Sequence, residues 1–390
     1  MVFLGVLGVL CGEIPSPAAE FETGQAARLV IGQPSFTAER PISSREALGG
    51  AGGVAVGGGR LFIADSNRMG AGPFNHRVLI YDALSSFLPA PDAELPQTSN
   101  CPACIGLPNT VLGQKAFDTS GPSLENGFNL PTAVATDGVR LAVADTDNNR
   151  VLLWRSIPSV HGTLPDVVIG QPDFKTNLPK TEQTGLRGPQ GVWFHNGRLF
   201  IADTQNSRVL IYNSIPTANG ARADVVLGQP DFNTRPHPDL TVSNVKPTTS
   251  SMLNPVSATT SGNRLFVADL GFNRVLLYNS IPASNNAPAD IVIGQPDFES
   301  AISNNAGKDA KLCAPTHKDD KGEDVYPNRC AATLSFPRFA LSDGTRLYIA
   351  DGGNDRVLIY NSIPTTNGAT ADVQLGQRSI HLIEEDNSSG

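Results

Sequence analysis

Two short phrases recur along most of this 390-residue chain, and this repetition constrains the fold more than any other feature. The first is Arg-Leu-Phe-Ile-Ala-Asp or a close variant, with copies that begin at Arg60, Arg140, Arg198, Arg264 and Arg346. After each copy come a polar turn and an Arg-Val-Leu run, which begins at Arg77, Arg150, Arg208, Arg274 and Arg356. The second phrase, Gly-Gln-Pro-Asp-Phe or a variant, begins at Gly32, Gly113, Gly170, Gly228, Gly294 and Gly376. Its copies lie 81, 57, 58, 66 and 82 residues apart, which indicates a unit of about 57 residues that accepts insertions.

Each unit contains four apolar runs bounded by turn residues, which is typical of four β-strands, a to d. In the third unit these runs are 191–194, 198–202, 208–212 and 224–228. Four strands repeated around a ring form the blades of a propeller, which leaves few exposed sheet edges. The 38 Gly and 30 Pro residues suit many short strands and tight turns. We therefore predict an all-β propeller of four-stranded antiparallel blades, with five complete blades and an orphan or partial sixth.

The two ends of the chain lie outside the complete units. A run that matches strand d, Leu29–Gln33, has no strands a to c before it. Residues 1–27 are either the remnant of a signal peptide, since 2–10 are apolar, or part of a blade, since Ile14-Pro15 matches Ile215-Pro216. The propeller is expected to span 28–380, followed by a tail of residues 381–390.

The turn between strands b and c resembles the signature of NHL repeats, through the runs Ala144–Val151, Ala202–Val209 and Ala350–Val357. This resemblance implies a propeller like those of bacterial secreted NHL-repeat proteins. Related six-bladed families include calcium-dependent lactonases and metal-dependent lyases, whose ligands lie in the central channel. The strand-a runs here, such as 53–56 and 132–135, are small and apolar and do not match those ligands. A metal-dependent lactonase- or lyase-like enzyme with its site in the central channel is therefore the alternative to our prediction. We predict no cofactor. If the resemblance to these families extended to a metal site, the ion would be calcium.

Asp and Arg lie five residues apart across the b–c turn in four of the five copies, as in Asp145 and Arg150. We predict that the Asp accepts hydrogen bonds from the backbone and from the Arg, and so fixes the turn. A ring of metal-binding Asp residues is the functional alternative. The aromatic residue that ends strand c is expected to pack between blades; it is Trp154, Tyr212, Tyr278 or Tyr360.

Because strands alternate in direction, the b–c and d–a loops share one face, which we call the top, and the a–b and c–d loops share the bottom. Loops on a rigid scaffold commonly carry function. We predict a non-enzymatic binding or scaffold module that engages a protein or a glycan through the top loops. The candidate contacts lie in the b–c turns: Asp147, Asn148, Gln205, Asn206, Phe272 and Asn354.

Two pairs of cysteines lie in long insertions. Cys101 and Cys104 belong to the bottom insertion 83–109, and Cys313 and Cys330 to the top insertion 299–335, so a shared zinc site is not expected. The second pair brackets the charged run 318–324, which cannot bury enough surface to order itself. We predict a Cys313–Cys330 disulfide, a local Cys101–Cys104 disulfide, and a secreted, periplasmic or cell-surface location, because cytosolic thiols stay reduced.

The charge distribution excludes some partners. Net charge is −8, and no run of Lys and Arg provides the basic footprint that nucleic acid requires. The apolar run 2–10 is short, and no other stretch approaches the roughly 18 apolar residues that a membrane span requires. We expect a monomer with no nucleic-acid partner and no integral membrane segment.

Overall fold

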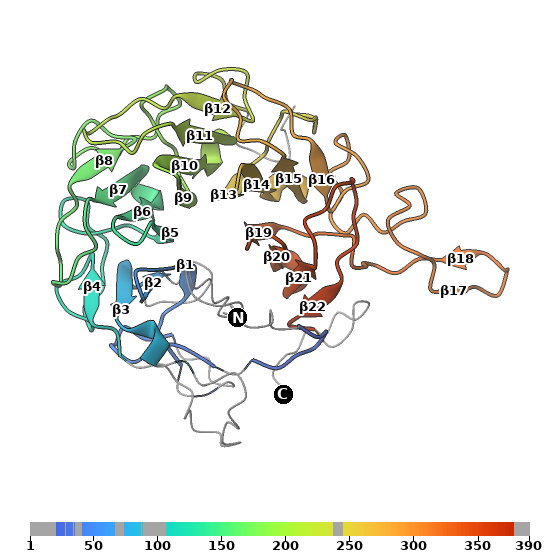
Figure 1. The fold of residues 1–390 in the computed structure, drawn as a ribbon, viewed down its shortest axis with the longest axis horizontal. Coiled ribbons are helices and arrows are strands. Elements are labelled where there is room, and N and C mark those ends of the chain that lie inside the picture. The colour runs from blue at the N-terminus through green and yellow to red at the C-terminus, as the bar shows by residue number, and fades with distance from the viewer. Residues whose placement is uncertain are drawn as a thin grey trace.

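The computed structural model describes residues 21–27, 29–33, 35, 41–66, 74–86, 88, 107–236 and 245–377. Five four-stranded antiparallel sheets stand around one axis, and each sheet is one blade of a β-propeller (Figure 1). Within each blade the strands pair in chain order, from the innermost strand a to the outermost strand d. The predicted fold class is therefore confirmed.

The strand bounds repeat from blade to blade. Blade 1 consists of β1 (Ala51–Gly57), β2 (Arg60–Asp65), β3 (Arg77–Tyr81) and β4 (Thr110–Leu112). Blade 2 consists of β5 (Pro131–Thr136), β6 (Leu141–Asp145), β7 (Arg150–Trp154) and β8 (Val167–Ile169). Blade 3 consists of β9 (Gly191–His195), β10 (Arg198–Asp203), β11 (Arg208–Tyr212) and β12 (Val225–Leu227). Blade 4 consists of β13 (Pro255–Ser261), β14 (Arg264–Asp269), β15 (Arg274–Tyr278) and β16 (Ile291–Ile293). Blade 5 consists of β19 (Pro337–Ser342), β20 (Leu347–Asp351), β21 (Arg356–Tyr360) and β22 (Val373–Leu375).

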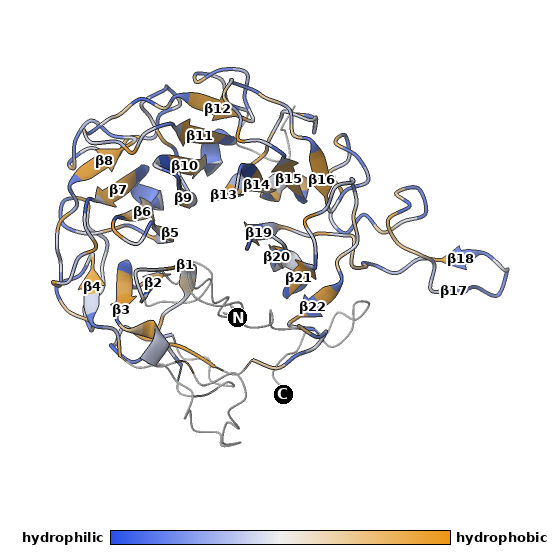
Figure 2. Cartoon of the chain, in the orientation of Figure 1, coloured by the Kyte–Doolittle hydropathy of each residue, from blue (hydrophilic) through white to orange (hydrophobic). Residues whose placement is uncertain are grey.

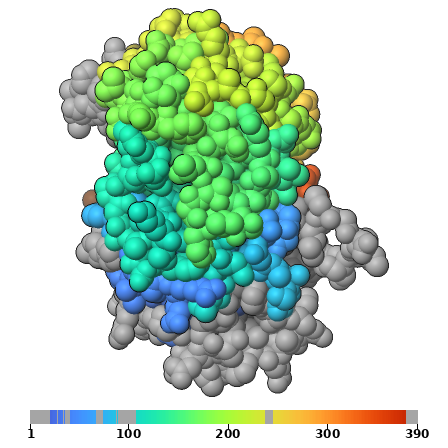
Figure 3. All heavy atoms as spheres, turned by 90° about the vertical axis from the view of Figure 1, so that its left-hand side faces the viewer, coloured from blue at the N-terminus to red at the C-terminus, as the bar shows by residue number. Residues whose placement is uncertain are grey.

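The hydrophobic core lies between blades, because alternate residues of each strand face opposite neighbours. One cluster joins Val151 and Leu153 of blade 2 to Leu199 and Ile201 of blade 3, and the other seams repeat this arrangement. Hydrophobic colour marks mainly the outer strands of the blades, and hydrophilic colour is common in the connecting loops (Figure 2). The blades follow one another in chain order (Figure 3). The predicted packing of the strand-c aromatics is confirmed, as Tyr212 lies in the seam with blade 2.

The predicted Cys313–Cys330 disulfide is present, with a Cα–Cα distance of 5.8 Å. It closes the base of the long d–a loop between blades 4 and 5. The expectation that the charged run is unstructured was wrong, since β17 (His317–Lys318) and β18 (Asp324–Val325) form a small hairpin. The reason is local turn chemistry: the Asp319 carboxylate accepts the backbone N–H groups of Lys321 and Glu323, both at 2.9 Å. Cys101 and Cys104 lie outside the described residues.

The described residues between 21 and 33 lie in the ring between blades 5 and 1 (Figure 1). Gly24 donates its N–H to the Gln374 carbonyl at 3.1 Å, and Thr23 Oγ1 accepts the Gln374 N–H at 3.3 Å. The c–d loop of blade 3 forms the same pair of hydrogen bonds with strand d of blade 2. Gly220 N–H donates to Val168 O at 3.0 Å, and Val168 N–H donates to Asn219 Oδ1 at 3.0 Å.

The number of residues between these hydrogen bonds and the following Gly-Gln phrase is also the same. Gly24 precedes Gly32 by eight residues, as Gly220 precedes Gly228. Leu29 and Ile31 then pack against blade 1 as a strand d packs against the next blade. Residues 21–27 and 29–33 therefore occupy the c–d loop and strand-d positions of a sixth blade. Residues 1–20, on which the signal-peptide interpretation depends, lie outside the described residues.

Candidate binding site on the top face

Each b–c turn is fixed by a buried ion pair, which in blade 3 joins Asp203 and Arg208. Arg208 Nε donates to Asp203 Oδ2 at 2.7 Å, and both side chains are fully buried. Asn206 Nδ2 donates to the same oxygen at 2.8 Å, and the Arg187 N–H donates to Oδ1 at 2.7 Å. The carboxylate is thus saturated by donors, which satisfies the condition for keeping a charge in a protein interior.

We call this buried Asp–Arg ion pair across the b–c turn the lock. The other blades repeat the lock at the positions that the sequence predicts. The buried pairs are Asp65–Arg77, Asp145–Arg150, Asp269–Arg274 and Asp351–Arg356, with Nε–Oδ2 distances of 2.7–2.9 Å. Burial raises the pKa of Asp145 to about 6, against the opposing effect of Arg150. The carboxylate therefore remains ionised and paired at pH 7. The predicted role of the repeated Asp, to fix the turn, is what the hydrogen bonds show.

Three of the predicted contact residues face into the protein. Asn148, Asn206 and Asn354 are buried, and each donates its side-chain amide to the lock Asp of its own blade. Phe272 is also buried, and the Arg274 guanidinium lies 4.9 Å from the centre of its ring. These four side chains are engaged by their own turns, so they offer little to a ligand in this conformation.

The remaining two predicted contacts, Asp147 and Gln205, are exposed on the top face. Each is the middle residue of a single 3-10 turn, Thr146–Asn148 or Thr204–Asn206. The turn directs its middle residue to solvent and its last residue toward the lock. Their backbone is anchored as well, since Asp147 N–H donates to Asn129 O at 3.1 Å and Gln205 N–H to Arg187 O at 3.2 Å.

Sequence reasoning missed one top-face residue, Phe336, which is 43% exposed. It precedes β19 and has φ of 47°, and its N–H donates to Asn273 Oδ1 at 3.0 Å. The corresponding positions before strand a hold Leu130, Gly188 and Asn254, all with positive φ. The sequence signal that could have identified Phe336 is an aromatic residue at a repeat position where the other copies have no aromatic residue. Exposed aromatic rings of this kind are enriched at binding surfaces.

In blade 1 a histidine holds the seam to the next blade. His76 Nδ1 accepts the N–H of Leu130 of blade 2 at 2.9 Å, and the ring is buried. In blades 2 and 4 an asparagine does the same, as Asn149 Oδ1 accepts the Gly188 N–H (2.8 Å). Burial lowers the pKa of His76, with a smaller opposing effect from Asp147. The seam between blades 1 and 2 thus depends on a neutral imidazole.

We predict that His76→Asn reduces the pH dependence of stability between pH 7 and 5. An unfolded histidine takes up its proton near pH 6.5. Because the pKa of His76 is lower in the folded protein, the native state loses stability as pH falls from about 6.5 through that lower value. Asparagine keeps the acceptor and does not titrate. Urea titrations at the two pH values measure the effect, with His317→Asn as the exposed control. Equal pH dependence in wild type and His76→Asn would contradict the assignment.

The channel is lined by the inner strands β1, β5, β9, β13 and β19 (Figure 1). Among these five strands the ionisable side chains are His195 and Arg338 alone, and none is a carboxylate. No group of three or more His, Cys, Asp or Glu residues within the described part of the chain is arranged to hold a metal ion. The inner strands therefore do not bring together the oxygen ligands that calcium requires.

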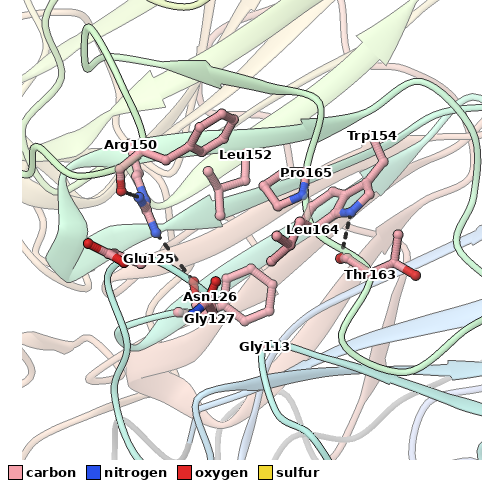
Figure 4. A pocket seen from close by; sticks show the side chains of 12 residues that line it. Gly113, Glu125, Asn126, Gly127, Arg150, Leu152, Trp154, Thr163, Leu164 and Pro165 are labelled. Carbon is pink, nitrogen blue, oxygen red and sulfur yellow. Dashed lines mark hydrogen bonds between the residues drawn. The ribbon is translucent and has the colours of Figure 1, made fainter.

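Two hollows can be described among the residues of the blades. A cavity in the seam between blades 1 and 2 encloses about 10 Å³, the space of one water molecule (Figure 4). Around it Arg150 donates to Gly127 O (3.3 Å) and Trp154 Nε1 to Thr163 O (3.0 Å). A shallower hollow of about 280 Å³ is lined by Glu182, Gln183, Thr184, Arg222, Phe232 and Asn233. The cavity borders Arg150 of the blade 2 lock, and the hollow is an open polar surface.

No protein-family model and no curated protein sequence matches this chain. Solved structures align with it at low identity. They include the computationally designed Ika8 protein (7% identity, TM-score 0.38, 87% of this chain and 66% of that one). A putative 6-phosphogluconolactonase from Bacteroides uniformis aligns at 13% identity and TM-score 0.40, over 84% and 85% of the two chains. Virginiamycin B lyase from Staphylococcus aureus aligns at 12% identity and TM-score 0.33, over 76% of this chain and 61% of the lyase.

At these identities and TM-scores the alignments do not define a function. The fold itself defines the class of protein, a β-propeller with five complete four-stranded blades. Membership of the NHL family stays a prediction from the repeat phrases. No helix in the described part of the chain is long and apolar enough to cross a membrane.

Proposed function

We propose that this protein is a non-enzymatic binding module whose top-face turns engage a protein or a glycan. The observation that carries the proposal is the contrast within each turn. Asp147 and Gln205 are exposed, whereas the next residue in each turn, Asn148 or Asn206, is held by the buried lock Asp of its blade. A surface held in one conformation before binding loses little conformational entropy on binding. Phe336 adds an exposed aromatic ring on the same face.

The alternative, a lactonase- or lyase-like enzyme with its site in the channel, receives no comparable support. Such an enzyme would draw metal ligands from the inner strands, and those strands contain no carboxylate and only two ionisable side chains, His195 and Arg338. We therefore place recognition on the top loops. The proposal includes export, which the Cys313–Cys330 disulfide supports because such bonds form in oxidising compartments.

The test is a triple variant, Asp147→Ala/Gln205→Ala/Phe336→Ala. These side chains are exposed, so we expect the melting temperature to change little and binding to a ligand identified on glycan and protein arrays to fall by about tenfold or more. The matched control is Val139→Ala/Val160→Ala/Leu164→Ala, which removes three exposed apolar side chains from bottom-face loops. Equal ligand affinity in the triple variant and the wild type would refute recognition by the top face.

A further inference from the structure

The sixth position of the ring is only partly filled by the described residues. Leu29 and Ile31 cover blade 1 at the outer rim. Phe21 covers Tyr348 of blade 5 toward the bottom, with ring centres 6.2 Å apart. No described residue stands beside the channel in the places that strands a and b take in the other blades. We therefore compare the exposure of the side chains that border the inner part of the sixth position with that of their counterparts in the four intact seams.

On the blade 1 side, the inner strand shows apolar side chains to solvent. Val54 and Val56 of β1 are 38% and 44% exposed. Register assigns Val54 the same place as four residues that are at most 6% exposed: Val134, Val192, Ala258 and Ala340. In the intact seams this side chain packs against the preceding blade, as Val192 does in the cluster shared with blade 2. Val54 faces the space where such a blade would stand.

The blade 5 side shows the complementary surface. Ala350 of β20 is half-buried, whereas its counterparts Ala64, Ala144, Ala202 and Ala268 are completely buried. Phe339 of β19 pairs with Ala350 and is 37% exposed. In the intact seams this side of a blade packs against the next blade. Both walls of the sixth position thus present the apolar surface that elsewhere binds inner strands.

A polar acceptor stands at the top of the same space. In the four intact seams, the residue with left-handed backbone after the b–c turn accepts the N–H that precedes the next strand a, as Asn149 accepts from Gly188. Blade 5 has Asp355 at this position, with φ of 49° and an exposed side chain. Within the described part of the chain its carboxylate has no hydrogen-bond partner. Among the described residues, none donates to this acceptor in the way that Gly188 donates to Asn149.

We infer that the inner part of the sixth position is a docking groove for a β-hairpin of a partner protein, whose two strands take the places of strands a and b. The groove continues an interface that the ring repeats four times, so those seams define its occupant. One strand carries apolar side chains on both faces, toward Val54 on one side and Phe339 on the other, and its leading N–H reaches Asp355. Addition of strands to an incomplete β-structure is an established mode of recognition. This groove is separate from the top-face contacts, so the two proposals fail independently.

The chain itself provides the probe, a peptide of residues 187–204. It contains β9 and β10, which are joined by the two-residue turn Asn196-Gly197, a strong signal for an isolated hairpin. The labelled peptide is titrated with the full-length protein and followed by fluorescence anisotropy. We expect saturable binding that Val54→Lys or Phe339→Lys weakens about tenfold or more, because either change places a charge in the groove. Asp355→Ala should also weaken binding, and Asp355→Asn should preserve it, since asparagine serves in blades 2 and 4.

The control is Val160→Lys, a change at a residue that is 67% exposed outside the groove, and it should bind the peptide as wild type does. Three results would overturn the inference: no binding, equal binding of a scrambled peptide, or affinity unchanged by Val54→Lys and Phe339→Lys. Analytical ultracentrifugation provides a further test. A dimer that Val54→Lys dissociates would assign the groove to a second copy of this chain and so refute the partner hairpin.

Discussion

Replacing Asp203 with alanine is expected to lower the free energy of unfolding by about 3–5 kcal/mol, because it leaves a buried charge without its partner. Arg208 is completely buried, and its Nε donates to Asp203 alone. The Arg187 N–H and the Asn206 amide lose the same acceptor. Each unsatisfied buried group adds to the loss. Urea unfolding monitored by circular dichroism measures the change.

The control for this prediction is Glu182→Ala in the adjoining d–a loop. It removes an exposed ion pair with Lys180, whose N–O distance is 3.2 Å, and should cost less than about 1 kcal/mol. Asp203→Asn should fall between the two, because an amide oxygen still accepts the Arg187 N–H while the charge is lost. A loss below 1 kcal/mol for Asp203→Ala would show that the lock does not stabilise the blade.

Loss of the Cys313–Cys330 disulfide is expected to cost about 3 kcal/mol, since the bond closes a loop of 17 residues. The bond also supports blade 5 directly, because Cys330 O accepts a hydrogen bond from Arg356 Nη2 at 3.0 Å. In the unfolded state the reduced chain gains the conformational freedom that the bond removes. Without the bond, the lock of blade 5 would also depend on a loop with greater freedom.

The measurement compares wild type with Cys313→Ser/Cys330→Ser by urea unfolding. Both proteins carry Cys11→Ser, Cys101→Ser and Cys104→Ser, so that no other thiol reacts. Addition of a reductant should lower the stability of the first protein to that of the second and leave the second unchanged. If the two proteins unfold at the same urea concentration before reduction, the disulfide does not stabilise the fold.

The strands could be predicted from the sequence because each blade repeats the same local pattern. Runs predicted at 198–202 and 208–212 are observed as Arg198–Asp203 and Arg208–Tyr212. The Asp–Arg lock was predictable for the same reason, since its partners lie at a fixed spacing across one turn. The second donor to the lock carboxylate, the Asn206 side chain, could not be predicted in this way. Spacing alone does not show that the 3-10 turn directs Asn206 inward and Gln205 outward.

Features that depend on neighbouring blades were harder to predict. Val54 lies in an ordinary strand-a run, and only the comparison with buried counterparts such as Val192 shows that it is more exposed than its place in the blade would give. Thr23 and Gly24 carry no recognisable phrase, yet their backbone grips Gln374 as other c–d loops grip their neighbours. Such contacts join residues 350 or more positions apart, and no local periodicity reports them.

The lock arginines contact their surrounding loops almost entirely through main-chain carbonyl oxygens. Arg208 donates to the carbonyls of Thr181, Glu182, Gly185 and Phe232, and Arg274 to those of Thr248, Ser251 and Phe298. Every amino acid provides a carbonyl, so the loop side chains are free to change while the backbone path is retained. Mutational drift in these loops would then alter what the protein recognises before it alters the blades. For an engineer, the d–a loops are positions where a library of sequences can be displayed on a constant frame.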